Sequence, residues 1–499
     1  MTRFIVTITP PTPNGDLHIG HIAGPFLAAD VFTRVQRQLG HECVLLSYSD
    51  DYQSYMLRKG LETGEDPVSL ARRNTDRIEA SLAAVGIRPD HWMRPYDNPW
   101  FAQAVTEVFG ALQDAGFIDY RESQEAWCPD CKVWGYEAFA RGLCNYCGAD
   151  SDASQCESCA QAPDAHLMTD LRCKLCSRPS EWKNTRRAFL KLAAFEPALR
   201  ERLLNRTWRA PLNTWLRETL THLHDWGVTR PEDGGLDLAA DGSCRVHTWF
   251  MGLAGYLAAF REYAANSGQP ELFRQFWQSG QGNLVHFLGF DCVFSHAIVY
   301  PAQLSVLTEL NVQQRFMPNQ FLKLDGLNLS TSRNHAIWVA DLARQACADS
   351  ARLYLASVAP EQSEGDFRLG QFLQWRAEIF DDFFPTLLEA GRNGPRDWWA
   401  GSCGPDAGLL EALRVRWSRA VDPEHFSMKG MAQVLLDAIA MARVRLADGR
   451  PAQHLAAFIA MAGKSLIPET SARIVSAFAL PEDRVNATLM SGSAAEYSI

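Results

Sequence analysis

Two histidines flank a glycine in the run His18-Ile19-Gly20-His21, near the beginning of this 499-residue chain. An imidazole N–H donates readily to a phosphate oxygen, and a glycine leaves room for a nucleotide base because it has no side chain. We therefore predict that this run binds the phosphates of a nucleotide. The alternative is a pair of surface histidines beside a helix cap.

The elements around this run are suited to positioning a phosphate. Residues 4–9 are apolar and β-branched, as expected of a buried parallel strand, and residues 19–37 follow a helical pattern. Proline and glycine separate the two segments. The strand therefore leads into the start of a helix, whose free N–H groups and partial positive charge favour an anion.

The run from Pro13 to His21, with Asp30 and Arg34 on the following helix, resembles the signature of class I aminoacyl-tRNA synthetases, and specifically methionyl-tRNA synthetases. The resemblance extends with gaps over nearly the whole chain. It implies an α/β fold with a Rossmann-type doubly wound parallel sheet, and activation of an amino acid by ATP with Mg²⁺. The ATP contacts that it implies are Thr12, Asn14, Gly15, His18, Gly20, His21, Arg230, Leu329 and Ser330.

Asp50 ends an apolar strand-like segment, where open α/β sheets bind their ligands. The resemblance implies that its carboxylate holds the amino group of the amino acid, whereas a helix N-cap is the alternative role. Taken without the family, Trp249 and Tyr256 fit plain core packing. The amino-acid contacts that the resemblance implies are Pro10, Thr12, Asp50, Trp249, Gly252, Leu253, Tyr256, Cys292 and His296.

Several positions depart from the family pattern. Thr12 replaces a tyrosine, Gln53 replaces a glycine and Phe290 replaces a lysine, which predicts a more polar pocket wall with fewer cations. The Lys-Met-Ser-Lys-Ser signature is Asn328-Leu329-Ser330-Thr331-Ser332, so both lysines are missing. Losing one transition-state donor costs about 100- to 1,000-fold in rate. We expect catalysis to rest on His18, His21, Ser330, Thr331, Ser332 and Arg333, although Arg333 could instead cap a surface loop.

Eight of the thirteen cysteines form four Cys-x-x-Cys pairs within one short region that is poor in large apolar residues. Such pairs predict two structural zinc sites of four cysteines each, whereas redox or buried thiols are the alternative. Single-zinc methionyl-tRNA synthetases keep the middle two pairs, so the resemblance implies that these pairs share one ion. The sites are then Cys144, Cys147, Cys156 and Cys159, and Cys128, Cys131, Cys173 and Cys176.

The alternation of strand and helix patterns divides the chain into four parts. We predict a first half of the catalytic core over 1–115, a zinc-bearing insertion over 116–225, a second half of the core over 226–340 and a helical domain over 341–499. Within these parts we expect the sheet to resume at 226–230 and to continue through 245–250 and 285–289, helices over 369–388 and 428–446, and a long loop over 391–408.

Composition and charge set only broad limits. There is no run of about eighteen apolar residues and no basic, apolar leader, so we expect no membrane span, no signal peptide and a cytoplasmic protein. The net charge of −10 does not exclude RNA, because an acidic enzyme can carry a local basic path.

The helical region lacks features by which the family reads an anticodon. Ala452 stands where the family has a tryptophan that stacks on a base, and Asp381 and Asp382 stand at asparagine positions. Three arginines on a late helix could bind anions or form a solvated face: Arg443, Arg445 and Arg450.

Three functions remain open. The first is an enzyme that activates an amino acid and passes the acyl group to a small molecule or carrier in a specialised biosynthetic pathway, with a separate cupin-type protein as a partner. The second is an authentic methionine-tRNA ligase, and the third is a non-catalytic binding module.

Overall fold

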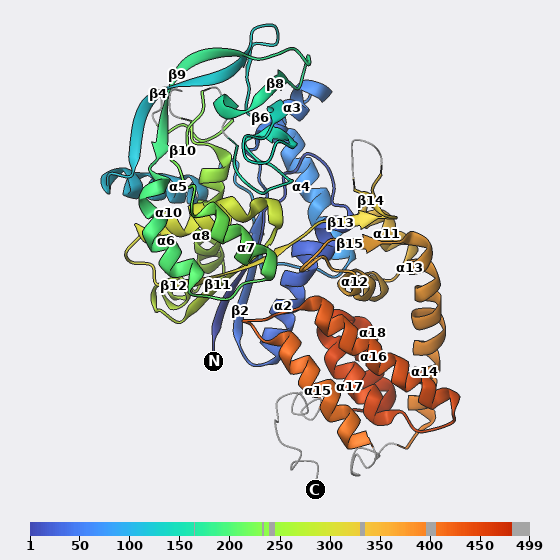
Figure 1. The fold of residues 1–499 in the computed structure, drawn as a ribbon. Coiled ribbons are helices and arrows are strands. Elements are labelled where there is room, and N and C mark those ends of the chain that lie inside the picture. The colour runs from blue at the N-terminus through green and yellow to red at the C-terminus, as the bar shows by residue number, and fades with distance from the viewer. Residues whose placement is uncertain (164, 232–233, 239–244, 330–334, 396–405, 482–499) are drawn as a thin grey trace.

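A five-stranded parallel sheet lies at the centre of the computed structural model, which describes all residues except 164, 232–233, 239–244, 330–334, 396–405 and 482–499 (Figure 1). Its strand order is β12-β11-β1-β2-β3, so the first strand lies in the middle. This arrangement confirms the predicted doubly wound α/β fold. The strands are β1 (Arg3–Ile8), β2 (Glu42–Tyr48), β3 (His91–Met93), β11 (Gly282–Gly289) and β12 (Val312–Asn319).

Alternate residues of β1 enter two separate hydrophobic cores. Phe4, Val6 and Ile8 pack on one face of the sheet, and Ile5 packs on the other. Both faces are therefore covered, as the apolar strand sequence predicts. The helices of the core are α2 (Leu27–Gln38), α3 (Ser54–Thr63), α4 (Pro67–Ala84), α5 (Pro99–Asp114), α8 (Thr248–Asn266), α9 (Glu271–Phe273) and α10 (Tyr300–Ser305), with π-helical turns over Arg274–Gln278 and Phe294–Val299.

The predicted helix over 19–37 is interrupted near its start. It begins as α1 (Ile19–His21), passes through a π-helical turn over Ile22–Phe26 and continues as α2. At Gly24 the backbone leaves helical geometry, and a Cβ there would lie 2.6 Å from the Asn319 side chain at the end of β12. Glycine thus lets the start of the helix lie directly against the sheet.

Two of the strand predictions are wrong. Residues 226–227 form β10, which pairs with β9 of the insertion and not with the parallel sheet. Residues 248–250 begin α8, whose N-cap is His247. The β-branched and aromatic residues there suggested a strand, but they belong to a helix that packs on α5 and the sheet and buries Thr248 and Phe250. The sheet resumes at β11, which includes the predicted segment 285–289.

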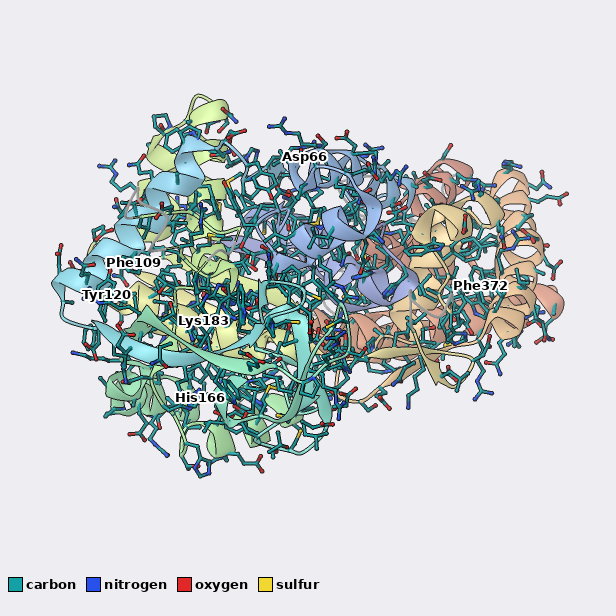
Figure 2. All side chains as sticks on the ribbon, turned by 90° about the horizontal axis from the view of Figure 1, so that it is seen from above. Asp66, Phe109, Tyr120, His166, Lys183 and Phe372 are labelled. Atoms are coloured by element: carbon teal, nitrogen blue, oxygen red, sulfur yellow. The ribbon has the colours of Figure 1, made fainter. Side chains whose placement is uncertain are left out.

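The insertion is built on a long antiparallel ribbon that projects from the core (Figure 1). Tyr120 and Lys183 mark this ribbon in Figure 2, and Phe372 marks the helices at the other end of the molecule. Two helices return the chain to the core. The elements are β4 (Ile118–Cys128), β5 (Val133–Trp134), β6 (Glu137–Leu143), β7 (Asp150–Ala153), β8 (Thr169–Cys173), β9 (Glu181–Leu190), β10 (Trp226–Gly227), α6 (Glu196–Leu204) and α7 (Ala210–Thr219).

The last part of the chain is mainly helical, as predicted, and packs against α2. The helix predicted over 369–388 is present as three consecutive helical pieces, and the one over 428–446 is α16. Part of the loop expected over 391–408 lies outside the described residues. The elements are β13 (Leu322–Leu324), β14 (Leu327–Asn328), α11 (Val339–Gln345), α12 (Ala348–Ser357), β15 (Gly365–Phe367), α13 (Leu369–Arg376), a π-helix (Ala377–Phe383), α14 (Phe384–Asn393), α15 (Ala407–Val421), α16 (Met428–Ala447), α17 (Gln453–Leu466) and α18 (Pro468–Phe478).

One buried arginine joins the core to the helical region. Arg352 of α12 is fully buried and donates to Asp30 of α2 at 2.7 Å and to the carbonyls of Ser465 and Leu466 at 2.7 and 3.0 Å.

Among the described residues, no helix combines the length and the apolar character that crossing a bilayer requires.

Candidate active site

A pocket of about 180 Å³ opens where β1, β2 and β11 end, facing the first turns of α8. This is the edge at which parallel sheets bind ligands. Of the nine positions at which amino-acid contacts were predicted, only Tyr256 does not line the pocket. The lining residues are Thr9, Pro10, Thr12, Tyr48, Asp50, Gln53, Tyr55, Gln155, Thr248, Trp249, Gly252, Leu253, Asp291, Cys292, Ser295 and His296.

Asp50 carries a carboxylate that hydrogen bonds hold in place. Thr248 donates to one carboxylate oxygen at 2.8 Å, and the side-chain amide of Gln53 donates to the other. Burial nevertheless raises the pKa of Asp50 to about 7. A buried carboxylate with this pKa gains stabilisation from a cation, so it is a suitable partner for an ammonium group.

Gln53 adds a second acceptor beside this carboxylate. Its side-chain oxygen is buried and makes no hydrogen bond within the described structure. Because the amide nitrogen of Gln53 already donates to Asp50, the oxygen is left to accept a hydrogen bond from a ligand. Gln53 thus replaces the family's glycine with a group that can take part in binding.

Tyr256 lies behind the pocket wall rather than in it. Its hydroxyl is 2.8 Å from Nε2 of His296, and His296 Nδ1 is 3.0 Å from the carbonyl of Cys292. Burial lowers the pKa of His296 to about 4, so the ring is neutral at pH 7. Tyr256 therefore fixes the orientation of a neutral imidazole that faces the pocket.

Tyr48 forms part of the floor of the pocket. Its ring packs on α8 at Gly255, where a Cβ would come within 2.6 Å of the ring, and its hydroxyl donates to the carbonyl of Gly252. The small residues of this helix thus admit an aromatic floor.

The sequence did not predict several polar residues of the pocket. Thr248 and Asp291 are neighbours of predicted residues, and that adjacency is a signal that could have identified them. Gln155 comes from the zinc insertion and donates to the Asp291 side chain at 3.1 Å. No local sequence signal links Gln155 to the core, because the contact spans 136 positions.

The paired histidines are arranged as neutral hydrogen-bond donors. His18 Nδ1 accepts from the Gly20 amide and His21 Nδ1 accepts from the His18 amide, both at 3.1 Å. Each ring therefore carries its proton on Nε2. Burial and the neighbouring His21 lower the pKa of His18 to about 2, and burial lowers the pKa of His21 to about 4. The site offers N–H groups to phosphate, with no charge from these rings at pH 7.

The loop before the histidines is anchored to α4. Asn74 donates to the Pro13 carbonyl at 2.9 Å, and Ser81 donates to Asp16 at 2.8 Å. This anchoring leaves Asn14 exposed and Gly15 with open space around it, so both are accessible to a ligand.

Two predicted ATP contacts are placed differently from what we expected. A Cβ at Gly20 would lie 2.8 Å from the Leu329 side chain, so Leu329 fills the space expected for the base. Arg230 is buried, lies 3.0 Å from Glu137 and donates to Ser154 at 2.9 Å. It does not line the pocket. The predicted residues Ser330, Thr331, Ser332 and Arg333 lie outside the described residues.

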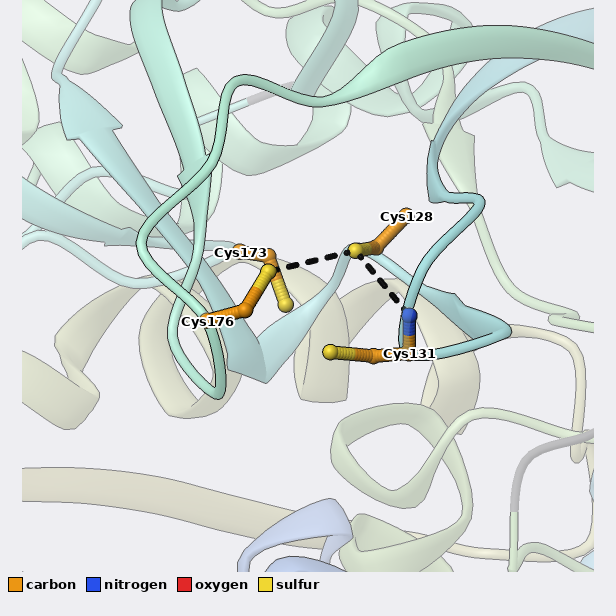
Figure 3. A group of neighbouring side chains, drawn as sticks. All are labelled: Cys128, Cys131, Cys173 and Cys176. Carbon is orange, nitrogen blue, oxygen red and sulfur yellow. Dashed lines mark hydrogen bonds between the residues drawn. The ribbon is translucent and has the colours of Figure 1, made fainter.

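The eight paired cysteines of the insertion form two groups of four. In each group the sulfur atoms lie within 4.8 Å of one another, and the groups are the two sets that the family resemblance implied. Figure 3 shows Cys128, Cys131, Cys173 and Cys176 converging from two segments, with the sulfur atoms of Cys128 and Cys176 at 3.5 Å. A Zn–S bond of about 2.3 Å in a tetrahedron requires about 3.8 Å between sulfur atoms. Both groups therefore fit a zinc ion.

This chain is similar in sequence to known proteins. The family of tRNA synthetases class I (M) matches residues 4–384. A methionine-tRNA ligase of Dehalococcoides mccartyi is 32% identical over 379 residues, covering 74% of this chain and 68% of the relative. One of Thermomicrobium roseum is 29% identical and covers 88% of this chain and 73% of the relative. One of Pyrococcus furiosus is also 29% identical, and the match spans 54% of its length.

Solved structures show the same fold. The methionyl-tRNA synthetase of Mycobacterium tuberculosis bound by methionyl-adenylate superposes with a TM-score of 0.74 over 99% of this chain and 97% of that one, at 17% identity. At this identity the match concerns the fold alone. With the family match over three quarters of its length and eight of the nine predicted amino-acid contacts lining one pocket, the chain belongs to the class I aminoacyl-tRNA synthetases, a family of ATP-dependent ligases, and is methionyl-tRNA synthetase-like.

Proposed function

We propose that this chain activates methionine with ATP and transfers the methionyl group to tRNA. The observation that carries the proposal is the pocket lined by Asp50, Trp249 and His296, together with the donor pair His18 and His21, whose ring centres lie 3.9 Å apart. A cavity of about 180 Å³ is smaller than the ~300–1,000 Å³ of pockets for larger ligands, and suits an amino acid. The relatives named methionine-tRNA ligase support the choice of amino acid and acceptor.

In the first step, which forms the aminoacyl adenylate, each residue has a separate role. Asp50 binds the ammonium group, so that the substrate carboxylate is oriented toward the α-phosphorus of ATP. One carboxylate oxygen bonds to that phosphorus, the bond to the bridging oxygen breaks, and pyrophosphate leaves. The Nε2–H groups of His18 and His21 stabilise the charge on the phosphate oxygens. Mg²⁺ accompanies ATP and neutralises part of the triphosphate charge.

In the second step a hydroxyl of the acceptor attacks the carbonyl carbon of the adenylate. The bond between this carbon and the phosphate oxygen breaks, AMP leaves, and the acceptor's proton passes to solvent. The pocket itself contributes the same groups as before, because the amino acid stays bound at Asp50.

A second candidate is transfer to a small molecule or carrier instead of tRNA. The helical region favours it: Ala452 is 5% exposed and cannot stack on a base, while Asp382 and Asp381 are exposed carboxylates, the latter 2.8 Å from Arg376. The three arginines considered for anion binding are all in ion pairs: Arg443 with Glu378, Arg445 with Asp406, and Arg450 with Asp448. The named relatives give no support to a small-molecule acceptor or a cupin-type partner.

One assay distinguishes the candidates. Amino-acid-dependent exchange of pyrophosphate into ATP is measured over a panel of amino acids, and acyl transfer is then measured to tRNA and to hydroxylamine. Methionine-dependent exchange with transfer to tRNA is the expected result. Exchange with transfer only to hydroxylamine favours the second candidate. Absence of exchange for every amino acid contradicts both and leaves a binding module.

We further propose that both cysteine groups hold structural zinc. Each offers four sulfur ligands, so neither leaves an open position for a substrate. The small apolar cluster beside the three-stranded sheet consists of Ala126, Ala140, Ala153, Met168 and Leu171. Because this cluster is small, the metal would supply much of the folding free energy of the insertion. Metal analysis of the purified protein tests this with an expected two zinc ions per chain.

A further inference from the structure

A second pocket of about 480 Å³ lies away from the amino-acid site, and the two share no lining residue. Its walls come from four parts of the fold: residues 206–209 between α6 and α7, the edge strand β12, residues 361–362 after α12, and residues 424–427 just before α16. The pocket thus lies where the insertion, the sheet and the helical region meet.

Guanidinium groups dominate this pocket. Arg206, Arg209 and Arg315 line it, and Arg202 lines an adjoining pocket that shares Arg206. The two carboxylates of the pocket are Glu361 and Glu424. Four guanidinium groups minus two carboxylates leave two positive charges concentrated between these elements.

The carboxylates do not fully neutralise the arginines. Glu361 accepts from Ser427 at 2.5 Å and from the Lys429 amide at 3.0 Å, while Arg209 lies 3.8 Å away. Glu424 pairs with Arg315, but its own side chain is 54% exposed. An exposed partner contributes little to neutralising a buried cation.

Arg315 also retains a free donor. Its side chain is 12% exposed, and its Nε–H is buried with no hydrogen-bond partner in the described structure. A buried donor without a partner is unfavourable, and a ligand that accepts its hydrogen bond would offset this cost.

The other two arginines are held rigidly by the edge strand. Arg206 donates to the Gln314 carbonyl at 2.9 Å, and Arg209 donates to the Pro318 carbonyl at 2.8 Å. These bonds satisfy two backbone carbonyls at the edge of the sheet, and they fix the two guanidinium groups beside Arg315. Burial, with repulsion from Arg315, lowers the pKa of Arg206, and the opposing attraction of Glu424 does not cancel these effects.

We propose that this pocket binds a phosphate group through Arg206 and Arg315, with Arg209 at its inner wall. A phosphate accepts several hydrogen bonds and carries the charge that the cluster lacks, and its geometry matches a guanidinium fork. Trp208, 5.4 Å from Phe316 between ring centres, adds an aromatic surface next to the arginines, so the phosphate can belong to a larger molecule. Free pyrophosphate and the backbone of an RNA strand are the two sources to be distinguished.

The test uses the full-length protein with ATP at saturation, so that the catalytic site does not take up the probe. Inorganic pyrophosphate is titrated by calorimetry, and a single-stranded RNA oligonucleotide by fluorescence anisotropy at several salt concentrations. The variants are Arg315→Gln, Arg206→Gln and the charge-preserving Arg206→Lys. Arg178→Gln is the matched control, because Arg178 forms an exposed ion pair with Asp130 in the insertion.

We expect Arg315→Gln and Arg206→Gln to weaken the binding of one probe at least tenfold, with Arg178→Gln within threefold of the unmodified protein. Arg206→Lys keeps the charge but loses the planar fork, so its affinity is expected to lie between these two limits. Loss of pyrophosphate binding identifies a free anion as the ligand. Loss of RNA binding, with a salt slope smaller by about one, identifies a polymer backbone. The proposal is wrong if the arginine variants bind both probes as tightly as the unmodified protein does, or if Arg178→Gln loses as much affinity as they do. Arg206→Gln decides the question if Arg315→Gln does not fold. Because pyrophosphate exchange is not the readout, this result is independent of the proposed function.

Discussion

Replacing Asp50 by asparagine tests the assignment of the amino-group site. The change removes the negative charge but keeps the size of the side chain, so Thr248 and Gln53 remain close to it. Truncating one partner of a buried charge pair costs about 2–5 kcal/mol. This predicts that Asp50→Asn weakens amino-acid binding by roughly 30-fold to several thousand-fold. Calorimetric titration of the amino acid measures the loss.

The pH dependence sharpens the prediction. The pKa of Asp50 is raised to about 7, and the bound ammonium requires the carboxylate, so binding must release the proton. Affinity in the unmodified protein should therefore rise from pH 6 to pH 8. With a pKa near 7, release on binding falls from about 0.9 proton at pH 6 to about 0.1 at pH 8. Asp50→Asn should show neither trend. Calorimetry in buffers of different ionisation enthalpy counts the protons.

Asp291→Asn is the matched control, because Asp291 is a second carboxylate of the same pocket and burial also raises its pKa, to about 6. We expect it to change affinity less than Asp50→Asn does. The reasoning is refuted if Asp291→Asn is the more damaging change, or if Asp50→Asn binds normally and keeps the pH dependence.

The remaining predictions concern the loop, the metal and the core. Asn328→Lys with Thr331→Lys restores two cations of the family signature and should raise the rate of pyrophosphate exchange about 100-fold; no gain would show that these positions do not meet the triphosphate. Cys176→Ala should lower the zinc content from two ions per chain to one by mass spectrometry, since its group loses a ligand; two retained ions would contradict the four-cysteine site. Arg352→Met should lower the free energy of unfolding by about 3–5 kcal/mol in urea titration, because Asp30 and three carbonyls lose a buried donor; an unchanged midpoint would remove Arg352 as the link between core and helices.

Local sequence patterns predicted the features that depend on local spacing. The strand-to-helix run at His18, the carboxylate at Asp50 and the cysteine pairs were all recognisable, because each places its chemistry within a few residues. The segment 245–250 was misread, since aromatic and β-branched residues fit a buried helix as well as a strand.

Features that depend on distant contacts could not be predicted in this way. Gln155 reaches the pocket from the insertion, and Leu329, just after β14, fills the space beside Gly20. Arg230 was expected at phosphate, but the buried Glu137 lies 3.0 Å away and pairs with it. In each case the partner is set by how separate parts of the chain pack, which the local sequence does not encode.

The central claim is that this pocket forms an aminoacyl adenylate, and direct detection of that product tests it most closely. The protein is incubated with α-labelled ATP, Mg²⁺ and methionine in the presence of pyrophosphatase, and the labelled products are separated after acid quenching. We predict methionyl-adenylate in amounts approaching one per chain, and none with Asp50→Asn. Formation of no adenylate with methionine or any other amino acid would contradict the claim.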